Sequence, residues 1–195
     1  MFYKFTKVVT TIFYAIFFRV KVYGKENIPK DSGALLCCNH QSYHDPVIMA
    51  TYATRVVHYM AKRSLFDVRG LNIIIRWLYA FPVDRDKTDL EAVRTTIKLL
   101  KSGEIVGIFA EGRRVKQGED HDAKSGTVLF AVKAGVPVIP VAISSTFKFF
   151  SKITVKYGEP IYFEELKGRV LNSETLAEGI AIVMEKIDEL KASIE

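Results

Sequence analysis

The feature that most constrains the fold of this 195-residue chain is the alternation of short apolar runs with helix-forming segments. Residues 34–38, 105–109 and 138–143 are continuous apolar runs, which are typical of strands buried on both faces of a parallel sheet. Two further strands are expected at 56–60 and 153–157, helices at 47–54, 127–134 and 173–192, and a helix or turn at 71–79. Because alternating strands and helices favour parallel pairing, we predict an α/β fold with a mostly parallel sheet flanked by helices.

The segment after residue 87 carries the signals of both ends of a helix. Thr88 and Glu91 form a capping-box pattern, in which a hydroxyl and a carboxylate close the first helical turn. Gly103 is suited to the position just after a helix. We therefore expect a helix between these points, with Leu90, Val93, Ile97 and Leu100 on one side.

Composition indicates one folded domain with a basic surface. The chain is 49% hydrophobic, enough for a sizeable core, and its length suits a single domain. We place an N-terminal helix at 1–22 and one α/β domain at 23–195. The 28 Lys and Arg against 22 Asp and Glu give a net charge of +6, which favours membrane lipid, nucleotide or nucleic acid as a partner. No aromatic-basic RNA-binding motif stands out, so we expect no nucleic-acid partner.

The first twenty residues have the pattern of an amphipathic helix. Its apolar side carries Phe2, Phe5, Val9, Ile12, Phe13, Ile16 and Val20. Lys4 and Lys7 lie on the other side, with Tyr3, Tyr14 and Phe18 nearer to them, as in a helix resting at the level of lipid headgroups. The uncharged run 8–18 is shorter than the ~20 residues that a spanning helix needs. Amphipathicity alone fits packing on the chain's own domain equally well, and 19–23 is a poor signal-peptide cleavage site.

The two cysteines, Cys37 and Cys38, are adjacent in an expected strand. Successive side chains of a strand point to opposite faces, so these thiols are poorly placed to bridge each other. We interpret both as core residues of a protein from a reducing compartment.

A histidine and a carboxylate stand five positions apart directly after the run that ends at Cys38. His40 would lie beyond the carboxyl end of a strand, where open α/β sheets bind ligands, and Pro46 suits the first turn of a helix. A neutral imidazole can take a proton from a substrate hydroxyl, and a carboxylate such as Asp45 can fix its tautomer and stabilise the imidazolium. Spacing alone still favours the simpler interpretation of a loop histidine and a helix N-cap aspartate.

Four sequence blocks place this pair in the context of one family. Asn39, His40 and Asp45 match an N-H-x-x-x-x-D signature. Residues 81–85 (FPVDR) match a second block that ends in arginine, 109–114 (FAEGRR) match a third usually written F-P-E-G-T-R, and 136–141 (VPVIPV) match an apolar fourth with prolines. Residues 33–143 thus resemble the glycerolipid acyltransferases, the family of 1-acyl-glycerol-3-phosphate acyltransferases.

The resemblance implies transfer of a fatty acyl chain from an acyl thioester to the sn-2 hydroxyl of 1-acyl-glycerol-3-phosphate (lysophosphatidic acid), giving phosphatidic acid. His40 would be the general base and Asp45 would hold its ring, so that the acceptor attacks the thioester without an acyl-enzyme. Ser42 would then support the loop. We expect backbone N–H groups near the first block to stabilise the oxyanion. The co-substrate would be acyl-CoA or acyl-acyl carrier protein, with no cofactor and no metal.

A phosphorylated acceptor calls for fixed positive charge, and the planar fork of arginine suits phosphate better than lysine does. The family match assigns Glu111, Gly112 and Arg114 to the glycerol-phosphate site, and Gly112 would let the backbone approach the ligand. The substrate-binding candidates are Arg85, Glu111, Gly112, Arg113 and Arg114, followed by Asn39, Lys62 and Lys124.

The third block departs from the family pattern where the headgroup should bind. Arg113 replaces the usual threonine and Ala110 the usual proline, so another lysophospholipid acceptor stays open as an alternative. A lipid substrate favours the membrane interpretation of the N-terminal helix. We expect a peripheral or monotopic protein on an anionic membrane surface, at the cytoplasmic face of the cell membrane.

Two alternatives belong to other functional classes. A metal-dependent hydrolase could use His40, His44 and Asp45, with His121 and Asp122 downstream, although H-x-x-x-H without a third ligand is a weak metal signal. A non-catalytic binder of membranes or nucleic acid would explain the net charge and the amphipathic helix. It would leave the His-Asp block and the spaced arginines without a role.

Overall fold

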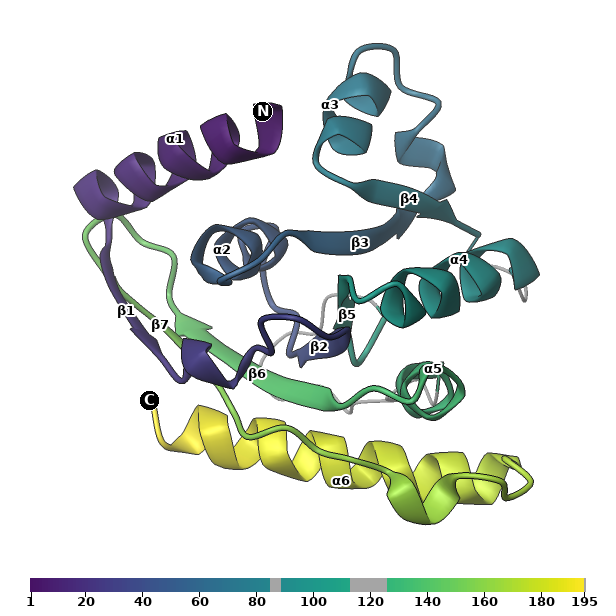
Figure 1. The fold of residues 1–195 in the computed structure, drawn as a ribbon. Coiled ribbons are helices and arrows are strands. Elements are labelled where there is room, and N and C mark those ends of the chain that lie inside the picture. The colour runs from purple at the N-terminus through teal and green to yellow at the C-terminus, as the bar shows by residue number, and fades with distance from the viewer. Residues whose placement is uncertain (85–88, 113–125, 195) are drawn as a thin grey trace.

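The chain forms a seven-stranded sheet with helices on both faces in a computed structural model that describes residues 1–84, 89–112 and 126–194 (Figure 1). The strands are β1 (Arg19–Tyr23), β2 (Ala34–Cys38), β3 (Val57–Lys62), β4 (Ala80–Val83), β5 (Ile105–Phe109), β6 (Val138–Ser145) and β7 (Lys152–Tyr157), in the order β1-β7-β6-β2-β5-β3-β4. Paired neighbours are parallel except for β6 and β7. The predicted α/β fold with a mostly parallel sheet is therefore confirmed.

Two hydrophobic cores lie on opposite faces of this sheet. The helices are α1 (Phe2–Phe17), α2 (Asp45–Tyr52), α3 (Leu71–Trp77), α4 (Leu90–Lys101), α5 (Gly126–Ala134) and α6 (Ser173–Ala192), joined by short 3-10 turns at Lys25–Asn27, Arg63–Leu65 and Glu164–Leu166. One core joins the sheet to α1 and α2, and the other joins it to α4, α5 and α6, as Figure 1 shows. The carboxyl ends of the parallel strands meet at one edge, so this arrangement brings distant loops together.

Strand β2 shows why its residues form a doubly buried strand. Leu36 and Cys38 belong to the core under α1 and α2, while Leu35 and Cys37 belong to the opposite core. The two cysteines are free and buried, and the prediction that they face opposite ways is confirmed. Burial raises the pKa of the Cys37 thiol to about 12 and that of Cys38 well above its usual value. Both thiols therefore stay protonated and unreactive near neutral pH.

The N-terminal helix is shorter than the predicted span 1–22. Helix α1 ends at Phe17, and the residues from Arg19 onward form β1, an edge strand parallel to β7. Arg19 and Lys21 are exposed whereas the valines between and after them are partly buried, which is the two-residue period of a strand. The alternating segment has only five residues, so it does not stand out beside the longer helical pattern before it. Strand β4, inside the second sequence block, was not predicted either.

Helix α4 begins later than the capping-box pattern predicted. Its N-cap is Asp89, whose carboxylate accepts the N–H of Ala92 at 3.0 Å, while Thr88 lies outside the described residues. Its buried positions include Ala92, Thr96 and Leu100, and Leu90 is exposed. The one-sided apolar pattern still located the helix, because that pattern depends on several turns rather than on the cap.

Candidate active site

Asn39 ties the loop after β2 to the neighbouring strand β6. Its side-chain amide donates to the carbonyl of Ile143 at 3.0 Å, and its side-chain oxygen accepts the N–H of the same residue at 2.9 Å. Asn39 is buried, so both bonds are shielded from water. These two bonds continue the pairing of β2 with β6 beyond the end of β2. They fix the position at which the loop leaves the sheet.

His40 and Asp45 meet as the sequence predicted. Nδ1 of His40 lies 3.0 Å from Oδ2 of Asp45, the first residue of α2. The same oxygen accepts the N–H groups of Gln41 and Ser42, each at 2.7 Å. Asp45 has 1% of its surface exposed. Its carboxylate is held in place by hydrogen bonds from the residues of the loop. It acts as a loop anchor and as the partner of the imidazole at once.

One face of the His40 ring packs against the ring of Phe109, at the end of β5. The two rings are stacked with their centroids 4.0 Å apart and an interplanar angle of 22°. When Nδ1–H donates to Asp45, Nε2 carries the lone pair, and no described residue forms a hydrogen bond with Nε2. The His40 side chain is 14% exposed. This arrangement suits a general base that takes a proton from a bound hydroxyl.

Glu111 connects the third sequence block to the first. Its Oε2 accepts the backbone N–H of His40 at 2.9 Å, and Glu111 itself is buried. Nearby, the N–H of Ala110 donates to the carbonyl of Cys38 at 3.1 Å, and Gly112 adopts a left-handed φ of 64° that closes the turn after β5. Glu111 was predicted as a substrate contact, and the structure shows in addition its contact with the His40 loop.

Five backbone N–H groups of the first block are engaged within the protein. Those of His40, Gln41 and Ser42 donate to the two carboxylates. The N–H of His44 donates to Oγ of Ser42 at 3.2 Å, and that of Asp45 to the carbonyl of Ser42 at 3.3 Å. Ser42 therefore supports the loop, as expected. These five N–H groups are engaged within the protein, and the expectation that N–H groups near the first block stabilise the oxyanion stays a prediction.

Of the remaining substrate candidates, one lies within the described residues and four lie outside them. Lys62 is exposed at the carboxyl end of β3, which lies at the same edge of the sheet as the His40 loop. The residues outside the described ranges are Arg85, Arg113, Arg114 and Lys124. Among the described residues, Val83 is the last residue of β4 and Gly112 follows the end of β5.

The metal-site alternative requires His40 and His44 to serve one ion. Nδ1 of His40 is bonded to Asp45, and Nδ1 of His44 lies 2.9 Å from the hydroxyl of Tyr14, so an ion would have to be held through the two Nε2 atoms. His121 and Asp122 lie outside the described residues. Within residues 1–84, 89–112 and 126–194, no three His, Cys, Asp or Glu side chains gather to hold a metal. The described geometry gives this alternative no support.

An apolar cavity of about 250 Å³ lies next to the loop that carries His40 and Asp45. Its walls come from α1, α2, α3, β3 and β4, and Pro46, adjacent to Asp45, is part of them. Another wall residue, Tyr59, stacks with Phe109 at 6.4 Å, and Phe109 in turn stacks on His40. Sequence reasoning missed this cavity because its lining is drawn from elements that only the fold assembles.

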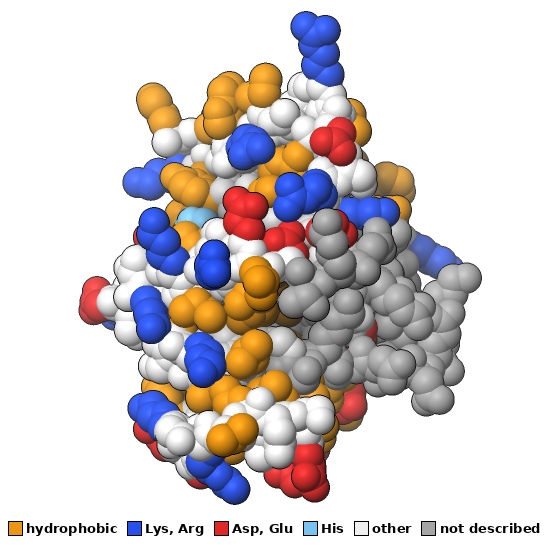
Figure 2. All heavy atoms as spheres, turned by 90° about the vertical axis from the view of Figure 1, so that its right-hand side faces the viewer, with side chains coloured by type: hydrophobic (Ala, Val, Ile, Leu, Met, Phe, Trp, Pro, Cys, Tyr) orange, Lys and Arg blue, Asp and Glu red, His pale blue; other side chains and the backbone are white. Residues whose placement is uncertain are grey.

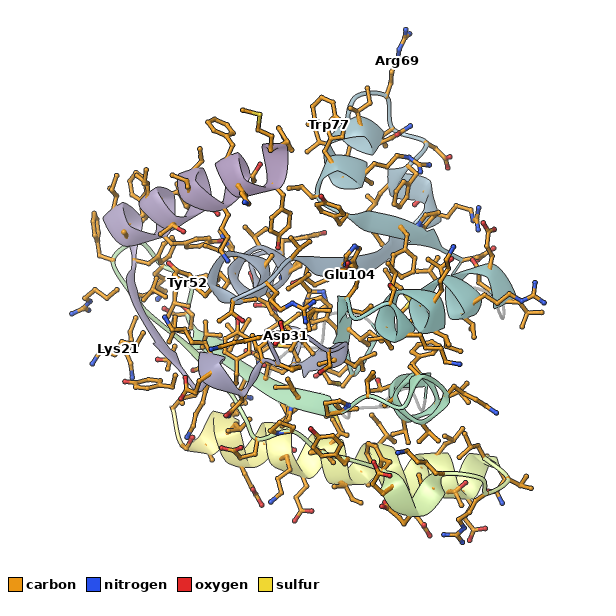
Figure 3. The ribbon with its side chains drawn as sticks, viewed as in Figure 1. Lys21, Asp31, Tyr52, Arg69, Trp77 and Glu104 are labelled. Atoms are coloured by element: carbon orange, nitrogen blue, oxygen red, sulfur yellow. The ribbon has the colours of Figure 1, made fainter. Side chains whose placement is uncertain are left out.

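Helix α1 turns its apolar side away from the protein. Its buried residues are Tyr3 and Tyr14, whereas Phe5, Ile12 and Ile16 are 65%, 54% and 59% exposed. Trp77 of α3 stands beside its amino end, with its ring 4.9 Å from that of Phe2 (Figure 3). No described helix is long and apolar enough to cross a membrane. The exposed side of α1 is therefore an apolar surface that the chain's own packing leaves uncovered.

Charged side chains accompany apolar ones elsewhere on the surface. Figure 2 shows Lys and Arg interspersed with hydrophobic groups on the face that carries α3 and α4. Around α1 itself, Lys4, Arg19 and Lys148 are exposed, and Phe149 contacts Phe17 with a centroid distance of 5.6 Å. A mixed basic and apolar surface of this kind complements an anionic lipid layer.

Comparison with known proteins points the same way as the geometry. Residues 19–144 match the family model described as Acyltransferase. A 1-acyl-sn-glycerol-3-phosphate acyltransferase of Bacillus subtilis is 36% identical over 182 residues, which cover 90% of each chain. Proteins of the same name from Borreliella burgdorferi and Streptococcus pneumoniae are 34% and 30% identical, over 74% and 97% of this chain and 59% and 74% of their own.

A solved structure shares the fold over nearly the whole chain. The crystal structure of the 1-acyl-sn-glycerophosphate (LPA) acyltransferase PlsC from Thermotoga maritima superposes with a TM-score of 0.75 and 29% sequence identity. The match covers 96% of this chain and 79% of that one. The sheet and its surrounding helices are thus common to both proteins.

Proposed function

The chain belongs to the acyltransferase family, and from this premise we propose that it transfers a fatty acyl group from an acyl thioester to the sn-2 hydroxyl of 1-acyl-glycerol-3-phosphate, giving phosphatidic acid. The names of its relatives support this acceptor. The donor is the acyl thioester of coenzyme A or of acyl carrier protein. The apolar cavity beside Pro46 supports a substrate with a hydrocarbon chain.

The observation that carries the proposal is the contact between His40 and Asp45 at the carboxyl end of β2. In the proposed reaction, Nε2 of His40 removes the acceptor proton while Asp45 stabilises the resulting imidazolium. The acceptor oxygen bonds to the thioester carbonyl, and the carbon–sulfur bond then breaks. The departing thiolate takes up the proton from His40. The acyl group passes directly from the thioester to the acceptor, so no acyl-enzyme forms.

The test is acyl transfer to 1-acyl-glycerol-3-phosphate, with acyl-CoA and acyl-acyl carrier protein offered in parallel. Lysophospholipids whose phosphate carries choline, ethanolamine or glycerol serve as competing acceptors. Transfer that requires the phosphate monoester supports the proposal. Preference for one of the other acceptors would replace the substrate assignment, and hydrolysis without transfer would contradict the reaction.

We propose that the acceptor phosphate meets the arginines of the second and third blocks, among which Arg114 matches the family motif. Glu111 was also assigned to this site, yet its bond to the N–H of His40 supports a different task. The two roles differ kinetically. A residue that binds the acceptor changes KM, whereas one that positions the base changes kcat.

Glu111→Ala should lower kcat about 10-fold or more, since a buried N–H that loses a charged acceptor costs roughly 1–3 kcal/mol. The acceptor KM should change little. Glu111→Gln keeps an oxygen for the N–H of His40 and should retain most of kcat. Steady-state kinetics of both variants provide the check, and a raised KM in both would instead assign Glu111 to the acceptor.

We propose further that the protein works at an anionic membrane surface, on the cytoplasmic face where acyl thioesters occur. The exposed apolar side of α1 and the basic residues around it support this location. Two buried free cysteines are in keeping with a reducing compartment.

Ile12→Glu should weaken binding to anionic vesicles by about 10-fold or more, because burying such a side chain contributes roughly 1.5–3 kcal/mol. Co-sedimentation with vesicles measures the effect. Ile182→Glu makes the same chemical change at an exposed position of α6 and should leave binding intact. Equal binding by Ile12→Glu and the unaltered protein would remove α1 from the docking surface.

A further inference from the structure

A polar contact joins the N-terminal helix directly to the catalytic loop. The hydroxyl of Tyr14, on the inner side of α1, lies 2.9 Å from Nδ1 of His44. Tyr14 is 2% exposed, and burial, followed by the neighbouring Tyr52 and Asp45, raises the pKa of its phenol. The hydroxyl therefore stays protonated and keeps its capacity to form this bond. A phenylalanine would fill the space equally well, so packing alone does not account for the hydroxyl.

The other neighbours of His44 are also connected to α1. Its ring stacks on Phe147 with centroids 5.1 Å apart and an interplanar angle of 13°, and the ring of Phe18 lies at a steep angle to it with a centroid distance of 6.2 Å. The loop that carries Phe147 is tied to the end of α1, because the N–H of Phe150 donates to the carbonyl of Phe17 at 2.7 Å. Phe18 and Phe147, which flank the His44 ring, are thus both connected to α1.

His44 occupies the position in the loop from which its side chain can set the orientation of Asp45. It immediately precedes Asp45, and its carbonyl accepts the N–H of Ile48 at 2.8 Å in the first turn of α2. Its own N–H bonds to Ser42, whose N–H in turn bonds to the carboxylate of Asp45. A shift of the His44 ring therefore changes the backbone that holds Asp45 against His40.

Helix α1 also rests on α2 beyond this contact. The hydroxyls of Thr10 and Thr51 are 2.8 Å apart, and the ammonium group of Lys7 donates to the carbonyl of Ala53 after the end of α2. The polar side of α1 is thus fastened along the helix that begins with Asp45, while its apolar side is exposed. A surface that binds the apolar side of α1 therefore also determines how the polar side of α1 lies on α2.

We propose that Tyr14 and His44 form a positioning pair, which holds the Asp45–His40 loop in its catalytic geometry and makes that geometry depend on how α1 is seated on lipid. The inference rests on the proposed acyl transfer at a membrane surface. Neither residue contacts the reacting atoms. Their effect passes through the backbone between His44 and Asp45.

The first test compares Tyr14→Phe, His44→Leu and the double variant in acyl transfer with the acceptor held in anionic vesicles. Loss of the one hydrogen bond should lower kcat about 2–10-fold, with the acceptor KM unchanged. The double variant should be no slower than His44→Leu, because both changes remove the same contact. His44→Asn, which places an amide near the position of Nδ1, should retain most of kcat.

Tyr52→Phe is the matched control, since its ring packs 6.5 Å from that of Tyr14 without a bond to His44. Melting temperatures of all variants separate loss of folding from loss of positioning. A wild-type kcat in Tyr14→Phe, additive effects in the double variant, or an equal loss in Tyr52→Phe would each overturn the proposal.

The second test needs no substrate. Hydrogen exchange of the amides at residues 40–48 is followed with and without vesicles of phosphatidylcholine and phosphatidylglycerol. Vesicles should slow exchange in the unaltered protein, and Tyr14→Phe should bind the vesicles without this slowing. Unchanged exchange in the unaltered protein would overturn the coupling. Slowed exchange without any acyl transfer would instead sustain the coupling and refute the proposed function.

Discussion

Replacing His40 with alanine should lower kcat for acyl transfer by about 10²–10⁴-fold, the usual contribution of a positioned proton-transfer group. The variant retains Asn39, Glu111 and the backbone bonds of the loop, so substrate binding should persist. The acceptor KM is therefore expected to change far less than kcat. Single-turnover transfer measured under saturating donor separates this chemical step from binding and product release.

His58→Ala provides a control for the loss of a buried histidine. His58 lies on β3, is mostly buried and bonds to the carbonyl of Ile105 at 3.2 Å, away from the loop that carries His40. This change should reduce the melting temperature and leave kcat largely intact. If His40→Ala transfers acyl groups at a near-normal rate, His40 is not the base and the proposed mechanism is wrong.

Asp45→Asn should lower kcat on the order of 10³-fold, because an amide in place of the carboxylate no longer stabilises the imidazolium or secures the tautomer. An asparagine oxygen can still accept the N–H groups of Gln41 and Ser42. The fold of the loop should therefore survive, and the melting temperature should fall less than in Asp45→Ala. Activity and thermal unfolding of the two variants provide the measurements.

The double variant His40→Ala/Asp45→Asn tests whether the carboxylate acts through the imidazole. Residues that work as one unit have strongly non-additive effects on kcat. The double variant should therefore be about as slow as His40→Ala alone. Losses that multiply would show that Asp45 serves the reaction independently of His40.

Much of the fold could be predicted from local sequence. The runs Ile105–Phe109 and Ala34–Cys38 are strands with the predicted bounds, and Ser173–Ala192 is a helix as expected. Each has an apolar pattern that its own residues define. The edge strands β1 and β4 lack such a run, because they lie at the two ends of the sheet and each gains its hydrogen bonds from one neighbouring strand.

The candidate site was only partly accessible to the same reasoning. The sequence indicated His40 and Asp45 because five positions separate them and a helix start brings them together. It assigned Glu111 to the substrate, which stays a prediction, and did not indicate the bond of Glu111 to the backbone of His40. It placed Tyr14 on the lysine side of the N-terminal helix, and the fold buries Tyr14 against the loop that carries His44.

The sequence by itself indicated the family, the mostly parallel sheet and the paired histidine and aspartate, because each motif and apolar run that points to them is formed by residues near one another along the chain. Only the tertiary structure decided what holds that pair. Three hydrogen bonds hold the pair and its loop, and each joins residues that are far apart in the sequence. They connect Glu111 with His40, Asn39 with Ile143 and Tyr14 with His44, across 71, 104 and 30 positions. Such contacts exist only after β5 and β6 align beside β2 and α1 packs on α2, since the parallel strands bring their carboxyl ends to a common edge.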